Sequence, residues 1–536
     1  MEFKFGGSEI NQRTVLGHPS GLFVLFFTEM WERFSYYGMR ALLVLFLTTS
    51  ILGDPLKGYS AGWGWERADA LVLYGWYTGL VYLTPIIGGF LADKIFGYRR
   101  AIVLGAFIMT LGHASMALEL FGDAFFYIGL LCLILGNGLF KPNISSIVGQ
   151  LYKTQGKEKD AGYTIFYMGI NAGAFLGILL CGYIGEKIGW HWGFGLAGIF
   201  MFLGMLQFYF AQKIFGKIGL QPTKTDDLDD AVEDTLEETK DAVEDIAKGK
   251  GFTKIERDRL TVIGIFAVFT IFFWWAFEQA GGSMTIFAAD YTDRALEGSA
   301  AMTFKVINTI ITLVPMLVIT WVLAMLFKQT FGSYAKSNVW LGLSFLIIWG
   351  IVVWMIYREF SADATEVPAS WFSVLNSLFI ILFAPLFSKI WESKLNPTGP
   401  VKFALGLILL GFGFAFLAYG SAAIPDGART ASVSMIWLII AYLLHTLGEL
   451  CLSPVGLSYV SKLAPIRIVG LMFGVWFVSN FIANLLGGIT GSYIDAISES
   501  YGLSNFFLIF TAIPIAAGIV LILMNKFLLK KMHGIR

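Results

Sequence analysis

Long apolar runs recur along almost the whole chain and are separated by short polar connectors. A helix of about 20 apolar residues spans the hydrocarbon core of a bilayer. Counting runs of this length predicts fourteen membrane-spanning helices. They lie at about 20–49, 69–92, 99–121, 125–148, 161–187, 191–213, 258–289, 302–327, 338–358, 370–390, 401–419, 433–458, 468–492 and 504–528. The pattern therefore predicts an all-α polytopic membrane protein.

The composition agrees with this prediction. Of the 536 residues, 56% are hydrophobic and 14% are charged, whereas soluble globular proteins are about 25% charged. These values exclude a disordered chain, a disulfide-rich secreted module and an ordinary cytosolic enzyme. The formal net charge is zero, so we expect no nucleic-acid partner.

The cysteines and the first residues carry two further expectations. All three cysteines lie in apolar runs, which argues against disulfides and against a cysteine-based zinc site; they are Cys132, Cys181 and Cys451. The first twenty residues contain no short apolar core. We therefore expect no cleaved signal peptide.

The distribution of Lys and Arg predicts the orientation of the spans. With the amino terminus inside, and with the amino-terminal tail and the long linker at 214–257 left out, the inner connectors and the carboxy-terminal tail hold seventeen of these residues, and the outer connectors hold six. The six outer residues are Lys57, Arg67, Lys187, Arg294, Arg358 and Arg429. Because an excess of positive charge marks the cytoplasmic side, we expect both termini in the cytoplasm.

An acidic segment at 214–257 interrupts the apolar runs after the sixth. Between Asp226 and Asp245 it holds eleven acidic residues and one Lys. Apolar residues recur at helical spacing within it, which predicts an amphipathic surface helix; they are Leu228, Val232, Leu236, Val243 and Ile246. We interpret the segment as a cytoplasmic linker between two halves, and the alternative is a regulatory or partner-binding helix.

The linker divides the chain into two bundles. An N-terminal six-helix bundle occupies 1–213, and a C-terminal six-helix bundle occupies 258–536 with an inserted helix pair at about 302–358. Six spans, a long linker and a second set of spans is the layout of a two-bundle transporter.

The first predicted span carries charges that are costly inside a membrane. At about 100° per residue, four charged residues and two tyrosines share an arc of about 140°; they are Glu29, Glu32, Arg33, Tyr36, Tyr37 and Arg40. Each charge facing lipid would cost ~2.5–3.5 kcal/mol, so this face must meet a wet cavity or partner charges. The alternative, an ion cluster that only holds helices together, is weakened because buried ion pairs are poor net stabilisers.

Other predicted spans hold single polar or charged residues in apolar surroundings. The charged ones are Lys141, Glu278 and Glu449, and two amides lie at Asn171 and Asn376. The cations can hold a carboxylate, one acid can hold an ammonium group, and the remaining acids can take a proton. This set suits a zwitterionic substrate and a proton, with no metal or other cofactor.

Four segments carry a family resemblance. Residues 29–38, which read Glu-x-x-Glu-Arg-Phe-x-Tyr-Tyr-Gly, resemble the signature of the proton-dependent oligopeptide transporter family within the major facilitator superfamily. Residues 88–100 resemble the superfamily loop between spans two and three. Residues 166–174 and 448–458 resemble the fifth-span and tenth-span signatures of the family. We therefore identify the chain as a member of the bacterial type.

The resemblance implies a fold, an activity and a location. The fold would be the major facilitator two-bundle fold of 6+6 transmembrane helices plus two extra helices, 14 in total. The activity would be proton-coupled symport of di- and tripeptides into the cell by alternating access. The location would be a bacterial inner membrane, where the chain acts as a monomer in the lipid bilayer.

The resemblance also assigns residues by matching motif. Proton coupling would rest on Glu29, Glu32, Arg33 and Glu278. Substrate binding would involve Arg40, Lys141, Tyr36, Tyr37, Tyr82, Asn171, Asn376, Glu449, Ser453 and Trp476. Within this set, Arg40 and Lys141 would hold the peptide carboxylate, and Glu449 with the two asparagines would hold its amino group. In the family, the position of Glu278 is paired with that of Arg40.

The chain departs from the family pattern in two ways. Bacterial members commonly carry the extra pair between spans six and seven, whereas here the segment with Glu278 follows the linker directly. The pair at 302–358 would therefore fall between core spans seven and eight. The second span lacks the His of animal members, so we expect coupling to rest on carboxylates.

Two alternative functions remain at the level of the sequence. A transporter of nitrate or another small anion is the first, although Glu449 would then have no ammonium group to meet. The second is an intramembrane enzyme that uses Glu29 and Glu32 as acid and base. We expect no enzyme, because no nucleophile, metal set or cofactor loop accompanies this pair.

Overall fold

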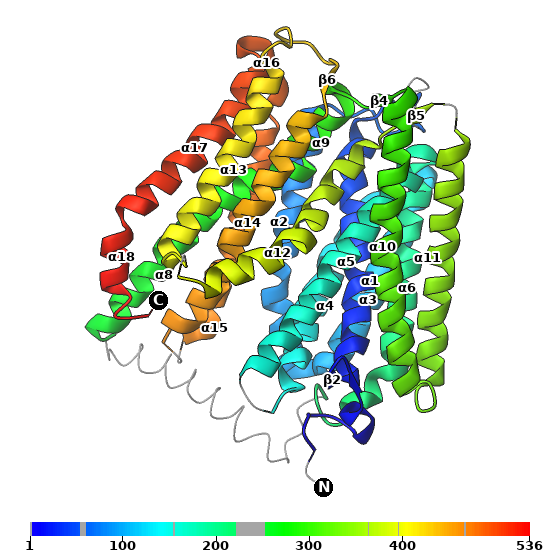
Figure 1. Ribbon diagram of the computed structural model, residues 1–536, viewed down its shortest axis with the longest axis vertical. Helices are drawn as coiled ribbons and strands as arrows, with labels where there is room; N and C mark the ends of the chain where they lie inside the picture. Colours follow the sequence, from blue (N-terminus) through cyan, green and yellow to red (C-terminus); the bar gives the residue numbers. More distant parts are fainter. Residues whose placement is uncertain are drawn as a thin grey trace. The chain divides into compact units, whose positions relative to one another are not determined.

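The structure is a computed structural model that describes residues 3–53, 60–153, 156–220, 252–362, 364–394, 396–465 and 468–535. Its long helices appear in Figure 1. They are α1 (Ser20–Thr48), α2 (Arg67–Leu91), α3 (Tyr98–Met116), α4 (Asp123–Gln150), α5 (Lys157–Lys187), α6 (Trp190–Ala211), α8 (Lys254–Phe277), α10 (Gly298–Thr330), α11 (Ala335–Ser361), α12 (Val374–Glu392), α13 (Gly399–Ser421), α14 (Ile436–Leu463), α15 (Val469–Gly491) and α17 (Leu503–Leu523).

Short elements lie at the helix ends and in the connectors. The short helices and helical turns are η1 (Glu9–Gln12), η2 (Ala92–Phe96), η3 (Glu119–Phe121), η4 (Gln212–Phe215), η5 (Glu278–Gly281), α9 (Ser283–Ile286), η6 (Phe287–Tyr291), η7 (Ala369–Ser373), α16 (Ile494–Tyr501) and α18 (Asn525–Lys531). The strands have two residues each and are β1 (Thr14–Val15), β2 (His18–Pro19), β3 (Thr292–Asp293), β4 (Ala295–Leu296), β5 (Thr365–Glu366) and β6 (Val433–Ser434). β1 pairs with β2, and β4 with β5, both antiparallel.

Each predicted apolar run coincides with a long helix, and most ends agree within a few residues. Of the helices in the described part of the chain, twelve are long and apolar enough to cross a membrane. The two other long helices are α1 and α3. α1 carries Glu29, Glu32, Arg33 and Arg40, the charges that set its pattern apart. The amphipathic helix expected in the acidic linker falls at 221–251, outside the described residues.

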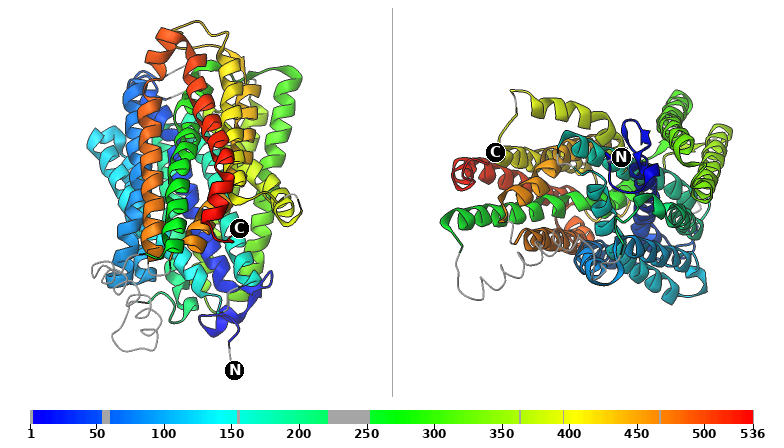
Figure 2. Two further views of the ribbon diagram at one scale, coloured as in Figure 1. Left: turned by 90° about the vertical axis from the view of Figure 1, so that its left-hand side faces the viewer. Right: turned by 90° about the horizontal axis from the view of Figure 1, so that it is seen from below.

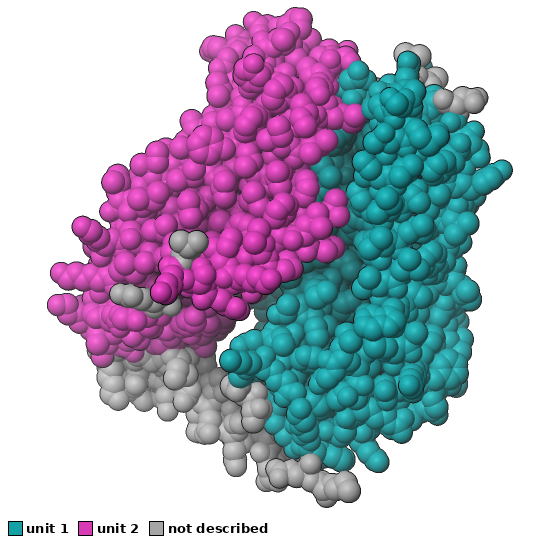
Figure 3. All heavy atoms as spheres, in the orientation of Figure 1, with its two compact units in different colours: residues 1–66, 84–221, 293–377 teal, residues 67–83, 222–292, 378–536 magenta. Residues whose placement is uncertain are grey.

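Contacts between Cα atoms divide the chain into two compact units, coloured separately in Figure 3. Unit 1 comprises Met1–Glu66, Thr84–Gln221 and Asp293–Ser377, and unit 2 comprises Arg67–Leu83, Pro222–Thr292 and Leu378–Arg536. These units do not follow the two halves of the sequence. The helix pair α10–α11 belongs to unit 1, and α2 and α12 each pass from one unit to the other.

Within unit 1, α1 packs closely along α5. Gly169, Gly173 and Gly177 recur every four residues and therefore share one face of α5. A Cβ atom added at Gly173 would lie 2.2 Å from the backbone oxygen of Met30, and one added at Gly177 would lie 2.2 Å from that of Phe34. Small residues at this spacing let helix backbones approach. This stripe therefore determines how the charged helix α1 is rotated and seated in unit 1.

The helix pair α10–α11 also packs inside unit 1, where α11 contacts α6 and α10 contacts α1. The two helices run side by side in both Figure 1 and Figure 2. The hydroxyl of Ser337 on α11 donates to the backbone oxygen of Gln207 on α6, at 2.8 Å. The Gln207 side chain in turn accepts from Thr28 on α1, at 2.9 Å. The inserted pair is thus joined by hydrogen bonds to helices of the first sequence half.

Within unit 2, the helices α13, α14 and α17 form one packed group, and α8 packs on α15. Glycines again mark the close approaches. A Cβ added at Gly406 would lie 2.8 Å from the backbone oxygen of Gly448, and one added at Gly75 would lie 2.8 Å from Cα of Gly488. The first part of α2 is therefore seated directly against α15.

Candidate functional site

The charged face of α1 holds a buried ion cluster. Glu29, Glu32 and Arg33 are 2%, 0% and 2% exposed. Nε of Arg33 lies 3.2 Å from Oε1 of Glu29 and forms a second ion pair with Oε2 of Glu32. One guanidinium therefore serves two carboxylates on the same helix, and the structure brings these three predicted residues together.

Asn137 on α4 completes this cluster, although no sequence pattern had singled it out. Its Nδ2 donates a 2.9 Å hydrogen bond to Oε1 of Glu32, and its side chain is fully buried. Both oxygens of Glu32 therefore accept hydrogen bonds. Oε2 of Glu29 is buried and has no hydrogen-bond partner among the described residues. The sequence held one clue, since Asn137 precedes Lys141 by one helical turn and shares its face.

The same face of α1 continues into aromatic and cationic groups. The rings of Tyr36 and Tyr37 meet edge to face, with centroids 5.1 Å apart. The guanidinium of Arg33 lies 5.4 Å from the Tyr36 ring, and that of Arg40 lies 5.9 Å from the Tyr37 ring. Both distances suit cation–π contacts. Since Tyr37 and Arg40 are half-buried, the face runs from a fully buried ion cluster to partly exposed groups.

The other predicted residues of unit 1 come from three further helices. Lys141 lies in α4 and is half-buried, as is Asn376 near the start of α12. Asn171 in α5 is buried, and its Nδ2 donates to the backbone oxygen of Tyr167 at 3.0 Å. Unit 1 therefore contributes both predicted cations for the substrate carboxylate and both predicted amides.

Glu278 in unit 2 lies where a helix breaks. α8 ends at Phe277, and the chain continues through the turn η5 and the short helices α9 and η6. The continuous helix expected at 258–289 is therefore interrupted, because Gly282 has φ −111° and ψ −105°, outside the helical range. The side-chain oxygen of Gln279 accepts from Ser283 at 2.7 Å, and its nitrogen donates to the backbone of α15. Breaks of this kind surround the binding sites of many transporters.

The remaining predicted residues of unit 2 come from three helices. Glu449 and Ser453 lie one turn apart on α14 and are half-buried, and Tyr82 on α2 is half-buried as well. Trp476 on α15 is buried. Its ring packs against α14, because a Cβ added at Gly456 would lie 2.4 Å from it. The tenth-span signature therefore supplies both polar groups and a seat for a large aromatic ring.

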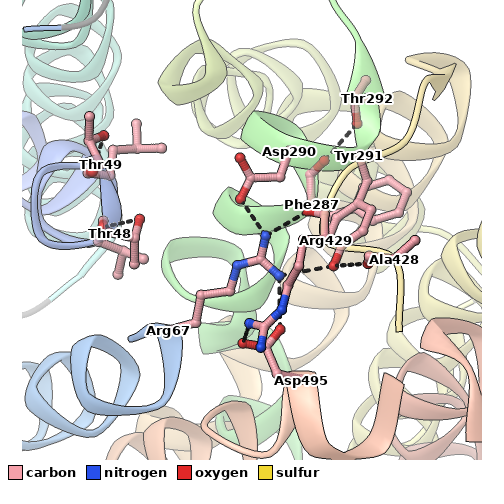
Figure 4. A network of polar contacts seen from close by, with 12 residues as sticks. Thr48, Thr49, Arg67, Phe287, Asp290, Tyr291, Thr292, Ala428, Arg429 and Asp495 are labelled. Atoms are coloured by element: carbon pink, nitrogen blue, oxygen red, sulfur yellow. Dashed lines mark hydrogen bonds and ion pairs between the residues drawn. The ribbon is translucent and has the colours of Figure 1, made fainter. Parts of the chain in front are cut away.

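An ion network in unit 2, drawn in Figure 4, was also not predicted from the sequence. Arg67 at the start of α2 lies 2.8 Å from Asp290 and 2.8 Å from Asp495. It also donates to the hydroxyl of Tyr291 at 2.9 Å and to the backbone oxygen of Arg429 at 2.8 Å. Arg429 itself pairs with Asp495. These partners are more than 200 positions from Arg67, so no local pattern links them.

Among the residues that the structure describes, no group of three or more His, Cys, Asp and Glu is placed to hold a metal ion. The polar groups on the charged face of α1 are carboxylates, guanidinium groups and phenols. Such groups move protons and bind charged solutes.

Comparison with known proteins identifies the family. The POT family model matches residues 99–232 and 344–509. The chain is 33% identical to the peptide transporter YePEPT of Yersinia enterocolitica, over 90% of this chain and 89% of that protein. It is 31% identical to a di-/tripeptide transporter of Lactococcus lactis subsp. cremoris, over 98% of this chain and 99% of that protein.

Solved structures agree. A crystal structure of a peptide transporter POT with sulfate has 31% sequence identity and a TM-score of 0.71, covering 97% of both chains. A mutant POT peptide transporter with alafosfalin has 30% identity and a TM-score of 0.73, covering 98% of both chains. The resemblance found in the four sequence signatures is confirmed: the chain is a multi-pass membrane protein that belongs to the POT family of transporters.

Proposed function

We propose that this protein is a proton-coupled symporter that imports di- and tripeptides by alternating access. The observation that carries the proposal is the buried cluster of Glu29, Glu32 and Arg33 in a long helix of a membrane protein. Ionisable groups at such positions mark ion pathways and proton relays. Relatives named as peptide and di-/tripeptide transporters support the choice of substrate.

The substrate is a zwitterion, and the two ends require opposite charges. Arg40 and Lys141 bind the peptide carboxylate, because both are half-buried cations. Glu449 binds the amino group, with Asn171 and Asn376 as further partners. The aromatic residues and Ser453 line the pockets for peptide side chains; they are Tyr36, Tyr37, Tyr82 and Trp476.

The driving ion is the proton, and no other cofactor takes part. Glu29, Glu32, Arg33 and Glu278 form the coupling set. Protonation of a carboxylate releases the cation that it holds, and the cation then becomes available to the peptide carboxylate. The helix break at Glu278 supports a role of this residue in proton coupling, because the break separates two helical segments that can move differently.

The membrane topology that we propose has fourteen spans, α1 and α3 included. α1 has 29 residues, which corresponds to about 43 Å at 1.5 Å per residue and exceeds the ~30 Å hydrocarbon core. Its three most central charges are buried in protein rather than exposed to lipid. α3 packs along α4, one of the twelve apolar helices.

The protein lies in a bacterial inner membrane as a monomer, with both termini in the cytoplasm. Three of the positive residues expected outside gather in unit 1: Lys187 pairs with Glu366 at 3.0 Å, Arg294 pairs with Glu366 at 2.9 Å, and Arg358 donates to the backbone of Lys187. Because these three residues lie together, we place their connectors on the same side of the membrane. A phosphatase that works only in the periplasm should be inactive when fused to the carboxy terminus. An active fusion would contradict the proposed orientation.

Alternating access requires two bodies that move against each other. We assign residues 1–213 to the first body and the six core helices of 258–536 to the second. The pair α10–α11 travels with the first body, because its contacts lie in unit 1.

Uptake of labelled dialanine into proteoliposomes tests the proposal. Uptake should rise when an inward proton gradient is imposed, and unlabelled di- and tripeptides should compete. Free amino acids and nitrate should not. Competition by nitrate alone would establish an anion transporter, and release of labelled alanine by the detergent-solubilised protein would establish a peptidase.

A further inference from the structure

We propose that Asn137 is a positioning residue of the proton-coupling cluster. It holds Glu32 as the fixed counter-ion of Arg33, and it thereby leaves Glu29 as the carboxyl that exchanges the transported proton. The inference rests on the proposed function. It assigns different roles to Glu29 and Glu32, which the sequence pattern does not distinguish.

The first step is that both carboxylate oxygens of Glu32 have hydrogen-bond partners. One oxygen of this carboxylate is paired with Nε of Arg33, and the other accepts from Nδ2 of Asn137 at 2.9 Å. Hydrogen bonds to the charged form of an acid favour that form. With both oxygens engaged in a fully buried position, Glu32 is fixed in place as the partner of the guanidinium.

The second step is the different situation of Glu29. It shares the same Nε of Arg33 at the longer distance of 3.2 Å, and its Oε2 is buried with no hydrogen-bond partner in the described chain. A buried charge without hydrogen bonds is costly, whereas a neutral carboxyl is tolerated. The charged groups that act on Glu29 are Arg33, Glu32 and, from α4, Lys141.

The third step is the rigidity of the segment that presents Asn137. Glycines flank this residue on both sides. A Cβ added at Gly136 would lie 2.7 Å from the backbone oxygen of Gly105 on α3, and one added at Gly138 would lie 2.9 Å from that of Thr84 on α2. The hydroxyl of Thr84 also donates to the backbone oxygen of Ile134 at 2.9 Å. α4 is therefore held closely by two helices at the level of the amide.

The position of Asn137 also connects the coupling cluster to the substrate. Lys141 lies one turn further along the same helix. α4 therefore carries both a residue assigned to the peptide carboxylate and the amide that secures Glu32.

The transport experiment compares Asn137→Ala with Asn143→Ala. Asn143 is a similarly buried amide of α4, but its Nδ2 donates to the backbone oxygen of Leu139 at 2.7 Å. Gradient-driven uptake of dialanine and substrate-for-substrate exchange are measured from about pH 5.5 to about pH 8. Asn137→Ala should move the midpoint of gradient-driven uptake by about one pH unit, because the loss of one hydrogen bond to a charged group lets Glu32 compete with Glu29 for the proton and for Arg33. Exchange should change less than about twofold, and the Asn143→Ala midpoint should not move.

A double-mutant cycle decides whether the amide acts through Glu32. Because Glu32→Gln is expected to lose uphill uptake, the cycle is measured by infrared titration of the purified variants. In a Glu32→Gln background, the Asn137→Ala change should add no titrating carboxyl band. An equal change of the carboxyl bands in both backgrounds, or an equal shift of the uptake midpoint with Asn143→Ala, would overturn the inference. Asn137→Ser, which removes the amide but retains a small polar group, should reproduce the shift if the alanine variant folds poorly.

An infrared titration provides a readout that does not depend on transport. Purified protein should show a buried carboxyl band whose pH-dependent part disappears in Glu29→Gln and persists in Glu32→Gln. In Asn137→Ala a second titrating band should appear, and it should vanish when Glu32→Gln is added. Loss of the wild-type band in Glu32→Gln alone would refute the division of roles, whereas absence of dialanine uptake by the wild type would refute only the proposed function.

Discussion

The backbone N–H of Ala369 lies 2.8 Å from Oε2 of Glu186, a fully buried carboxylate near the end of α5. The other oxygen of Glu186 accepts from the backbone N–H of Ser370 at 2.9 Å and from its hydroxyl. These donors open η7, which leads directly into α12. A carboxylate at the first turn of a helix satisfies N–H groups that have no partner within it. Glu186 therefore anchors on α5 the segment that carries Asn376.

Removal of this carboxylate should destabilise the protein. Glu186→Ala leaves three donors of η7 without an acceptor, and each buried unsatisfied group costs about 1–3 kcal/mol. We expect a loss of about 3 kcal/mol or more in unfolding by denaturant in detergent. Glu359→Gln, which changes a half-buried acid bonded to Tyr183, should cost less than about 1 kcal/mol. Equal losses in the two variants would contradict the anchoring role.

Replacement of either acid of the α1 cluster should uncouple transport from the proton. Glu29→Gln and Glu32→Gln should lose uphill uptake and retain exchange, since exchange needs no net proton movement. One charge moving down 100 mV supplies ~2.3 kcal/mol, or about a 50-fold gradient. Arg33→Ala should behave in the same way, whereas Arg40→Ala should lose exchange as well. Normal gradient-driven uptake by Glu32→Gln would show that the cluster only holds helices together.

Both ends of the peptide should be needed for binding. The predicted charges for the two ends are opposite, with Arg40 and Lys141 for the carboxylate and Glu449 for the amino group. A desolvated charge left without its partner costs about 2–5 kcal/mol, or roughly 30- to 4,000-fold in affinity. Acetyl-dialanine should therefore compete poorly with labelled dialanine in binding to purified protein. Competition equal to that of dialanine would contradict the assignment of Glu449 to the peptide amino group.

The network of Arg67 should contribute strongly to stability. Arg67→Ala leaves the carboxylates of Asp290 and Asp495 without the guanidinium that they share. Removing one partner of a buried ion pair costs about 3–5 kcal/mol, so we expect a clear fall in the thermal unfolding midpoint in detergent. The matched change is Arg429→Ala, at a side chain that is 52% exposed. It should cost less than about 1 kcal/mol, and a reversal of this order would refute the account.

Glu119 should make stability depend on pH. This residue lies in the connector η3, where burial raises its pKa from an ordinary value of 4.5 to about 7, against a hydrogen bond from the backbone of Leu120. A raised pKa means that the folded protein binds the proton more tightly than the unfolded chain does. Stability from this group is therefore complete below about pH 4.5 and is lost as the pH rises to about 7.

Thermal unfolding of wild type and Glu119→Gln at about pH 5 and about pH 8 measures this effect. The wild type should lose stability relative to the variant at the higher pH, because the introduced glutamine side chain is neutral at both values. Asp123→Asn at the start of α4 is the control for a change of charge nearby. A difference between wild type and Glu119→Gln that is constant with pH would contradict the prediction.

The charged face of α1 was predictable because a charge inside a membrane is costly and therefore informative. Glu29, Glu32, Arg33 and Arg40 stand out in the sequence, since lipid tolerates no charge on an unprotected face. Periodicity then places them on one side of α1 without any tertiary information.

The residues that were missed are the ones whose partners lie far away along the chain. Asn137 is an ordinary amide until α4 is placed beside α1, where it meets Glu32. Glu186 is an ordinary acid near a helix end in the sequence, and only the folded chain shows that the first residue of η7 donates a hydrogen bond to it. The helix break at Glu278 was also missed, because hydropathy continues across Gly282 while the backbone does not.

The all-helical membrane class, the family and the charged face of α1 followed from the order of the residues, because they depend on local periodicity and on the cost of charge in lipid. Three outcomes needed the folded chain: which carboxylate oxygens are satisfied, which helices share a unit, and where α10 and α11 pack. They depend on contacts between residues separated by tens to hundreds of positions. No local pattern encodes them, since each requires two helices to meet at one depth and one rotation.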